Sequence, residues 1–102
     1  MAVPSRHLHD LYKLFVSVRN EKEAKILLED ILTPKELQEV AERWQIVRAL
    51  AAGIPQRTIA DNLDVSIATI TRGSRALHHG SGGFQHFLRK TGLNKGWRWL
   101  FE

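Results

Sequence analysis

The stretch QRTIADNLDVSIATITRGSRAL, residues 56–77, has the pattern of two short helices joined by a tight turn. In its first half, apolar residues recur at the three- and four-residue spacing of one helix face, at Ile59, Ala60 and Leu63. Ser66 is a typical N-cap residue for the second helix, from which Ile70 would pack back onto the first. This is the pattern of a helix-turn-helix. Helical hairpins that bind no nucleic acid fit it too, so a merely solvated hairpin is the alternative.

The turn between the two predicted helices contains an aspartate. Asp64 stands where glycine is usual, and aspartate adopts the left-handed backbone conformation less readily than glycine but more readily than most residues. Val65 then closes the turn. The small side chain of Ala60 permits the two helices to cross closely.

A helix-turn-helix binds DNA with its second helix in the major groove, where the N-terminal residues reach base edges. Threonine hydroxyl and methyl groups can contact bases directly or through water. We therefore expect DNA contacts from the beginning of the second helix, at Ser66, Ile67, Ala68, Thr69 and Thr71. Gln56 and Arg57 open the first helix and are placed for phosphate contact, as is His78 at the end of the second.

The net charge of +4 is unevenly distributed along the chain. Residues 1–32 hold five basic and five acidic side chains, and residues 33–53 hold three of each, whereas residues 54–91 hold five basic and two acidic. The positive excess therefore lies in the C-terminal half, around the predicted helix-turn-helix. It indicates an anionic partner there, such as double-stranded DNA.

Outside this motif the chain is also helical in pattern, and no segment alternates as a strand would. Apolar spacing predicts helices over residues 5–20 and around residues 24–31. Thr33, Pro34 and Glu36 then have the order of an N-cap, a first helical residue and a capping-box acid, opening a helix that Gly53 would end. A short helix over residues 84–90 follows the flexible HHGSGG segment. The expected fold class is all-α.

A length of 102 residues fits one small domain, which we place at residues 1–91 with a C-terminal tail at 92–102. The absence of cysteine excludes a disulfide framework and thiolate metal sites. No apolar run approaches the ~20 residues of a membrane span and no signal peptide is evident, so we expect a cytoplasmic protein. The first three helices are too apolar for one thin domain to cover, which favours a homodimer over a monomeric bundle.

Two segments carry a family resemblance: LTP at the start of the third predicted helix and ATITRGS in the second half of the motif. Together they resemble the bacterial Trp repressor family over residues 32–77. The resemblance implies an all-helical, intertwined dimer that acts as a sequence-specific transcriptional repressor, with L-tryptophan as corepressor and tryptophan biosynthesis genes as targets. Trp repressor itself is a known example of a helix-turn-helix protein with water-mediated operator contacts.

The resemblance also implies a tryptophan site. The indole would lie between Arg43 and Arg72, whose guanidinium faces stack well on aromatic rings. Arg72 would also pair with the ligand carboxylate, helped by Thr33, and the backbone near Leu32 would accept from the ligand's ammonium group. Gly73 would let the indole approach the helix closely; the other interpretation is that Gly73 relieves crowding against another helix. No other cofactor and no metal ion is expected.

Several positions depart from the family pattern. Ala76 stands where a serine near the ligand's amino end is usual, and Asp30 replaces an apolar residue near the same end. The GIPQR turn is one residue shorter, and RALHHGSGGF is closer to a less characterised branch. A related regulator with no ligand, or with a different small molecule, is therefore the alternative. The tail with Trp97 and Trp99 would dock on the dimer or stay disordered.

Two other classes of function fit the residues less well. His78 and His79 diverge on a helix and cannot hold one metal ion together. No carboxylate pair and no nucleophile beside a base calls for catalysis, so we do not expect an enzyme. A protein–protein adaptor that uses the helical hairpin and the aromatic tail is a further alternative. Its binding would change little with salt, unlike binding to phosphates.

Overall fold

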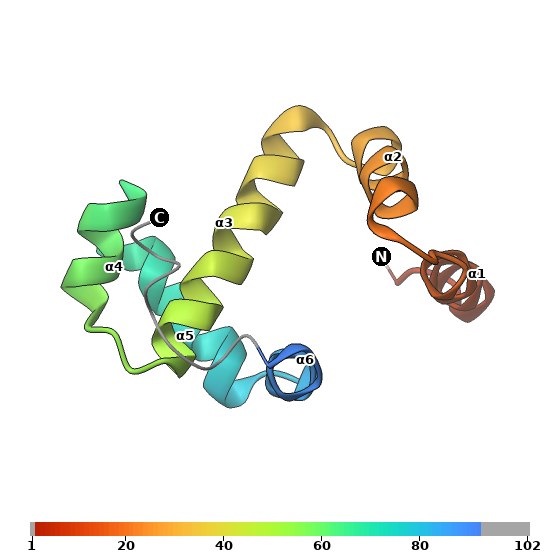
Figure 1. Ribbon diagram of the computed structural model, residues 1–102. Coiled ribbons are helices and arrows are strands. Elements are labelled where there is room, and N and C mark those ends of the chain that lie inside the picture. The colour runs from red at the N-terminus through yellow and green to blue at the C-terminus, as the bar shows by residue number, and fades with distance from the viewer. Residues whose placement is uncertain (1, 93–102) are drawn as a thin grey trace. The chain divides into compact units, whose positions relative to one another are not determined.

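Six helices make up the computed structural model, which describes residues 2–92 (Figure 1). In chain order they are α1 (Ser5–Val16), α2 (Glu21–Ile31), α3 (Pro34–Ala51), α4 (Gln56–Leu63), α5 (Ile67–His79) and α6 (Gly83–Thr91). No strand occurs in residues 2–92, which confirms the expected all-α fold class. The aromatic part of the predicted tail, with Trp97 and Trp99, lies outside the described residues.

The chain divides into two compact units, Met1–Leu37 and Gln38–Glu102. The first unit holds α1, α2 and the first turn of α3. The second unit holds the rest of α3 together with α4, α5 and α6. The predicted helix-turn-helix therefore belongs to the second unit. The assignment of residues 1–91 to one domain stays a prediction.

The boundary between the first two helices differs from the prediction. The first helix was expected to reach residue 20, but α1 ends at Val16. Asn20 instead begins α2, because its Oδ1 accepts from the backbone N–H of Glu23 at 2.9 Å, and the Glu23 carboxylate accepts from the N–H of Arg19 at 2.9 Å. Asparagine side chains satisfy the free N–H groups at a helix start better than they extend a helix interior. The prediction for residues 17–20 is therefore wrong.

The start of α3 is the predicted capping box. The Thr33 N–H donates to Glu36 Oε1 at 2.8 Å, and the Glu36 N–H donates to Thr33 Oγ1 at 3.1 Å. These bonds satisfy two N–H groups that have no partner within the helix. Hydrogen bonding by Thr33, first through its backbone N–H and then through its side chain, lowers the pKa of the Glu36 carboxyl. At neutral pH the box is thus held by an ionised glutamate.

No described residue of the first unit is buried. Apolar side chains of α1 and α2 are instead well exposed: Leu11 is 38% exposed, Phe15 47% and Ile26 56%. Exposed apolar surface gathered on amphipathic helices is characteristic of a face that packs against a partner. The unit as described leaves this face uncovered.

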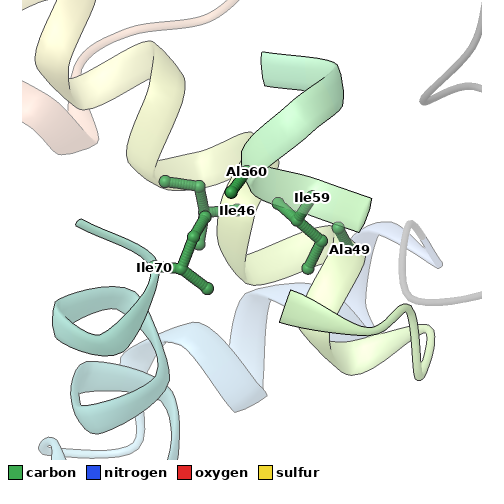
Figure 2. Packing of buried hydrophobic residues seen from close by; sticks show 5 residues of the cluster. All are labelled: Ile46, Ala49, Ile59, Ala60 and Ile70. Atoms are coloured by element: carbon green, nitrogen blue, oxygen red, sulfur yellow. The ribbon is translucent and has the colours of Figure 1, made fainter. Parts of the chain in front are cut away.

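The core of the second unit joins three helices. Figure 2 shows the side chains of Ile46 and Ala49 from α3, Ile59 and Ala60 from α4, and Ile70 from α5 converging. All five are at most 7% exposed. A neighbouring cluster joins Val47, Leu77 and Leu88, and is flanked by the stacked rings of Trp44 and Phe84, whose centroids are 6.1 Å apart. The inward positions predicted at Ile59, Ala60 and Ile70 are confirmed.

Within the second unit, α5 crosses α3 at Gly73. This glycine is buried, and a Cβ built on it would lie 2.7 Å from Cγ2 of Ile46, too close for two carbon atoms. Ile46 is itself 1% exposed and has little room to move. Relief of crowding between two helices thus accounts for a glycine inside a helix. A role for Gly73 at a ligand stays a prediction.

Gly73→Ala is expected to destabilise the protein by about 1–3 kcal/mol, although alanine is the better helix former, because the added methyl overpacks the crossing. Chemical denaturation measures the change. Gly83→Ala is the matched control, since Gly83 is also helical but has no atom within 4 Å of the added Cβ. In an Ile46→Leu background, which removes Cγ2, the cost of Gly73→Ala should fall. Equal effects of the two glycine substitutions would contradict this account of the crossing.

Candidate DNA interface and ligand cavity

The turn between α4 and α5 has the predicted left-handed residue. Asp64 has φ 54° and ψ 49°, and is the only non-glycine residue with positive φ in residues 2–92. Its N–H bonds the carbonyl of Ala60, and the Val65 N–H donates to the same oxygen at 3.1 Å. These bonds end α4 and reverse the chain, so that α5 packs against α4. The helix-turn-helix geometry is thus present.

The start of α5 is held by Ser66. Its Oγ accepts from the Thr69 N–H at 3.1 Å and lies 2.9 Å from the Thr69 hydroxyl. The predicted N-cap is confirmed. Both side chains are engaged locally, and Thr69 is half-buried. Any contact of these two residues with DNA stays a prediction.

The outward face of α5 is positive and lacks acidic residues. Its inner face is formed by the buried residues Ile70, Gly73 and Leu77. The exposed residues are Ile67, Ala68, Thr71, Arg72, Arg75, His78 and His79. Gln56 and Arg57 are also exposed, at the start of α4. Except for Thr69, the residues predicted to contact DNA are therefore accessible, and Arg75 is an exposed cation that the prediction omitted.

A cavity of about 390 Å³ lies between α3 and the turn and first half of α5. It is lined by Glu39, Glu42, Arg43, Ile46, Asp64, Val65, Ser66, Thr69 and Arg72. The two arginines predicted to hold the indole thus share one cavity, and its volume is in the range of small-molecule sites. Gly73 does not line it. Leu32 and Thr33 belong to the first unit.

The cavity also holds three carboxylates that sequence reasoning missed, those of Glu39, Glu42 and Asp64. No ion pair joins them to Arg43 or Arg72 within the described part of the chain. Both kinds of charge are thus available to a ligand, and the lining as a whole is slightly acidic. Helical spacing places Glu39 and Glu42 one turn apart, but only the fold brings Asp64 to them.

Asp30, which departs from the family pattern near the ligand's amino end, lies in the first unit. It lines a separate cavity of about 320 Å³ together with Leu14, Ser17, Val18, Glu23, Ile26 and Leu27. Within residues 2–92 no group of three or more histidine or acidic side chains is arranged to hold a metal ion.

Comparison with known proteins identifies the family. The model of the Trp repressor protein family matches residues 6–92. The chain belongs to the Trp repressor family. A Trp operon repressor homolog from Chlamydia trachomatis serovar L2 is 40% identical over 86 residues, covering 83% of this chain and 74% of the relative. A Trp operon repressor homolog from Mannheimia succiniciproducens is 39% identical over 90 residues, covering 84% and 89%.

The fold comparison agrees with the sequence comparison. The crystal structure of a TrpR-like protein from Eubacterium eligens superimposes with a TM-score of 0.81 at 25% identity, covering 85% of this chain and 90% of that one. The Trp repressor family is a family of transcription regulators and not of enzymes, and its members in general bind DNA and form dimers. As a member of this family, the protein is a DNA-binding regulator. None of the helices in residues 2–92 is long and apolar enough to span a membrane.

Ser66→Ala is expected to lower the free energy of unfolding by about 1 kcal/mol, because the first turn of α5 loses its capping oxygen. Ser66→Asn supplies an equivalent oxygen and should retain most of the stability. Urea titration of both variants measures the difference. If alanine and asparagine behaved alike, the cap would not be what holds the start of this helix.

Proposed function

We propose that this member of the Trp repressor family is a homodimeric, sequence-specific transcriptional repressor that binds operator DNA through α5. L-Tryptophan is the proposed corepressor, and tryptophan biosynthesis genes are the proposed targets. The observation that carries the proposal is the position of the cavity, which has Arg43 and Arg72 in its lining and lies beside the first half of α5. A ligand there would contact both the core helix and the DNA-facing helix.

The surface of α5 supports DNA binding. Ala68 and Thr71 are exposed near its N-terminal end, where a helix in the major groove reaches base edges. The Thr71 hydroxyl donates to the Ile67 carbonyl at 3.0 Å, which leaves its oxygen lone pairs and its methyl group free to face a base. The absence of acidic residues on α5 avoids repulsion of phosphate.

The first unit supports a dimer. Its apolar face on α1 and α2 has no buried residue, and a second copy of the chain would remove that surface from water. In the proposed intertwined arrangement, the unit of one protomer packs on its partner. Light scattering at micromolar concentration is expected to give twice the 11.7 kDa chain mass, and a monomer would exclude this arrangement.

The proposed mechanism is a shift of population. Two recognition helices read successive major grooves only when they lie about 34 Å apart. A ligand between α3 and α5 favours that spacing only if it binds the DNA-competent arrangement more tightly than the others. An indole held between the guanidinium groups of Arg43 and Arg72 would meet this condition, because the two arginines come from different helices.

A second candidate keeps DNA binding and changes the ligand. The carboxylates of Glu39, Glu42 and Asp64 share the cavity with the two arginines. They would attract an ammonium group but repel the ligand's carboxylate. A small molecule that has an ammonium group and no carboxylate is therefore the second candidate ligand. Comparison of L-tryptophan with tryptamine, which has no carboxylate, separates the two candidates.

Thr71→Ala is expected to weaken binding to DNA selected from a randomised pool several-fold, with little effect on unfolding, because Thr71 is exposed. Binding of the wild type should fall by orders of magnitude between low and high salt. Fluorescence anisotropy measures both quantities. Binding that is indifferent to salt would favour a protein–protein adaptor, and an unaltered Thr71→Ala variant would remove this residue from base recognition.

Calorimetric titration with L-tryptophan is expected to saturate at one ligand per chain. Arg72→Ala should weaken binding by about tenfold or more, since the cavity loses the arginine proposed to pair with the ligand carboxylate. Arg75→Ala is the matched control, because Arg75 lies on the same helix outside the cavity lining and should leave the affinity unchanged. If titration with L-tryptophan gave no heat of binding while DNA binding persisted, the result would favour a DNA-binding regulator with another ligand or with no ligand.

A further inference from the structure

Arg75 is an arginine in the second half of α5. It lies seven residues, about two helical turns, after Ala68, so the two share one line along the helix. The buried residues Ile70, Gly73 and Leu77 form the opposite line, against α3, α4 and α6. Arg75 and Ala68 are both exposed. The side chain of Arg75 therefore begins on the side of the helix that faces away from the core.

This arginine has no partner within residues 2–92. It makes no hydrogen bond or ion pair there, and α5 contains no acidic residue that could neutralise it. Arg72, the other arginine of the helix, differs because it lines the cavity. Arg75 is thus the arginine of α5 whose charge is directed neither to the core nor to the cavity.

The distance along the helix indicates which part of DNA Arg75 meets. At 1.5 Å per residue, it lies about 12 Å beyond Ile67 along the axis. The major groove is about 12 Å wide. When α5 points into the groove, which is about 8.5 Å deep, with its N-terminal end at the base edges, Arg75 is therefore near the margin of the groove, where the phosphates lie, and not over its floor.

We propose that Arg75 binds a backbone phosphate at the margin of the major groove and anchors the C-terminal half of α5 on DNA. The inference rests on the proposed DNA binding and adds a contact that the sequence had not indicated. A guanidinium suits this role because its planar group of donors matches the oxygens of a phosphate and keeps its charge at every relevant pH. His79, one turn further on, lies near the same line and is exposed.

This geometry assigns base contacts and phosphate contacts to different residues of α5. Ala68 and Thr71 are short and lie toward the beginning of α5, so they can approach bases. Arg75 is long and lies toward its end, so it can reach outward to the backbone. A phosphate contact positions a protein on DNA without reading sequence. Loss of Arg75 should therefore weaken binding to all DNA sequences alike.

The test uses the full chain with Arg75→Ala, Arg75→Lys and Arg89→Ala. Arg89 is an exposed arginine on α6, so its removal changes the net charge equally. Anisotropy of a fluorescein-labelled mixed-sequence duplex, and of duplexes selected from a randomised pool, gives Kd across a range of salt concentrations. Thermal unfolding of each variant should match the wild type, since neither arginine is buried.

For Arg75→Ala we expect Kd to rise about tenfold at low salt on both kinds of duplex. The slope of log K against log salt should fall by about 0.9 for each chain in contact. Arg75→Lys should keep the slope, because a lysine still neutralises a phosphate, and Arg89→Ala should bind like the wild type.

If the wild type binds DNA, three results would overturn the inference. Wild-type affinity in Arg75→Ala would show that the residue does not meet DNA. Equal losses of DNA affinity in Arg75→Ala and Arg89→Ala would show that the effect comes from the net charge alone. A loss confined to selected duplexes and not restored by lysine would indicate a base contact instead. If the wild type itself bound neither duplex in a salt-dependent way, the proposed DNA binding would fail, and this inference with it.

Discussion

The contact between Gly73 and Ile46 determines how closely α5 lies against α3, and the rest of the second unit depends on it. Ile46 belongs both to the buried core and to the lining of the cavity. Arg43 lies one turn before Ile46 on α3, and Arg72 is adjacent to Gly73 on α5. The crossing therefore brings the two arginines to one cavity. A side chain at residue 73 would separate α3 from α5 and so displace both walls of the cavity.

Helix α5 combines three roles because its residues project in different directions. Ile70, Gly73 and Leu77 are buried and hold it in the fold, whereas Arg72 and Thr69 line the cavity. Most of its remaining side chains are exposed, and these include the positive charge of Arg75 and no acidic residue. A ligand in the cavity is thus one helix thickness from the surface proposed to meet DNA. Under the proposed mechanism, this proximity would couple ligand binding to DNA binding without a long pathway.

The helix caps and the turn that depend on neighbouring residues in the chain were predicted correctly. The capping box of Thr33 and Glu36, the left-handed Asp64 and the Ser66 cap all involve residues within four positions of one another. The end of the first helix was misplaced because asparagine suits both ends of helices, and only the bond to Glu23 shows that Asn20 begins α2. Sequence reasoning also overlooked Arg75, although its spacing from Ala68 by two helical turns was visible.

The sequence by itself determined the all-α class, the helix-turn-helix and the family, because periodicity, caps and the ATITRGS segment are properties of short stretches. Through its resemblance to the Trp repressor family, the sequence also predicted that Arg43 and Arg72 act as a pair at one ligand site. Only the tertiary structure decided that Gly73 is needed for the packing of α5 on Ile46, and that Glu39, Glu42 and Asp64 share the cavity with the arginines. The physical reason is that these contacts join residues far apart in the chain, and a spacing along one helix does not tell which residue of another helix will lie opposite.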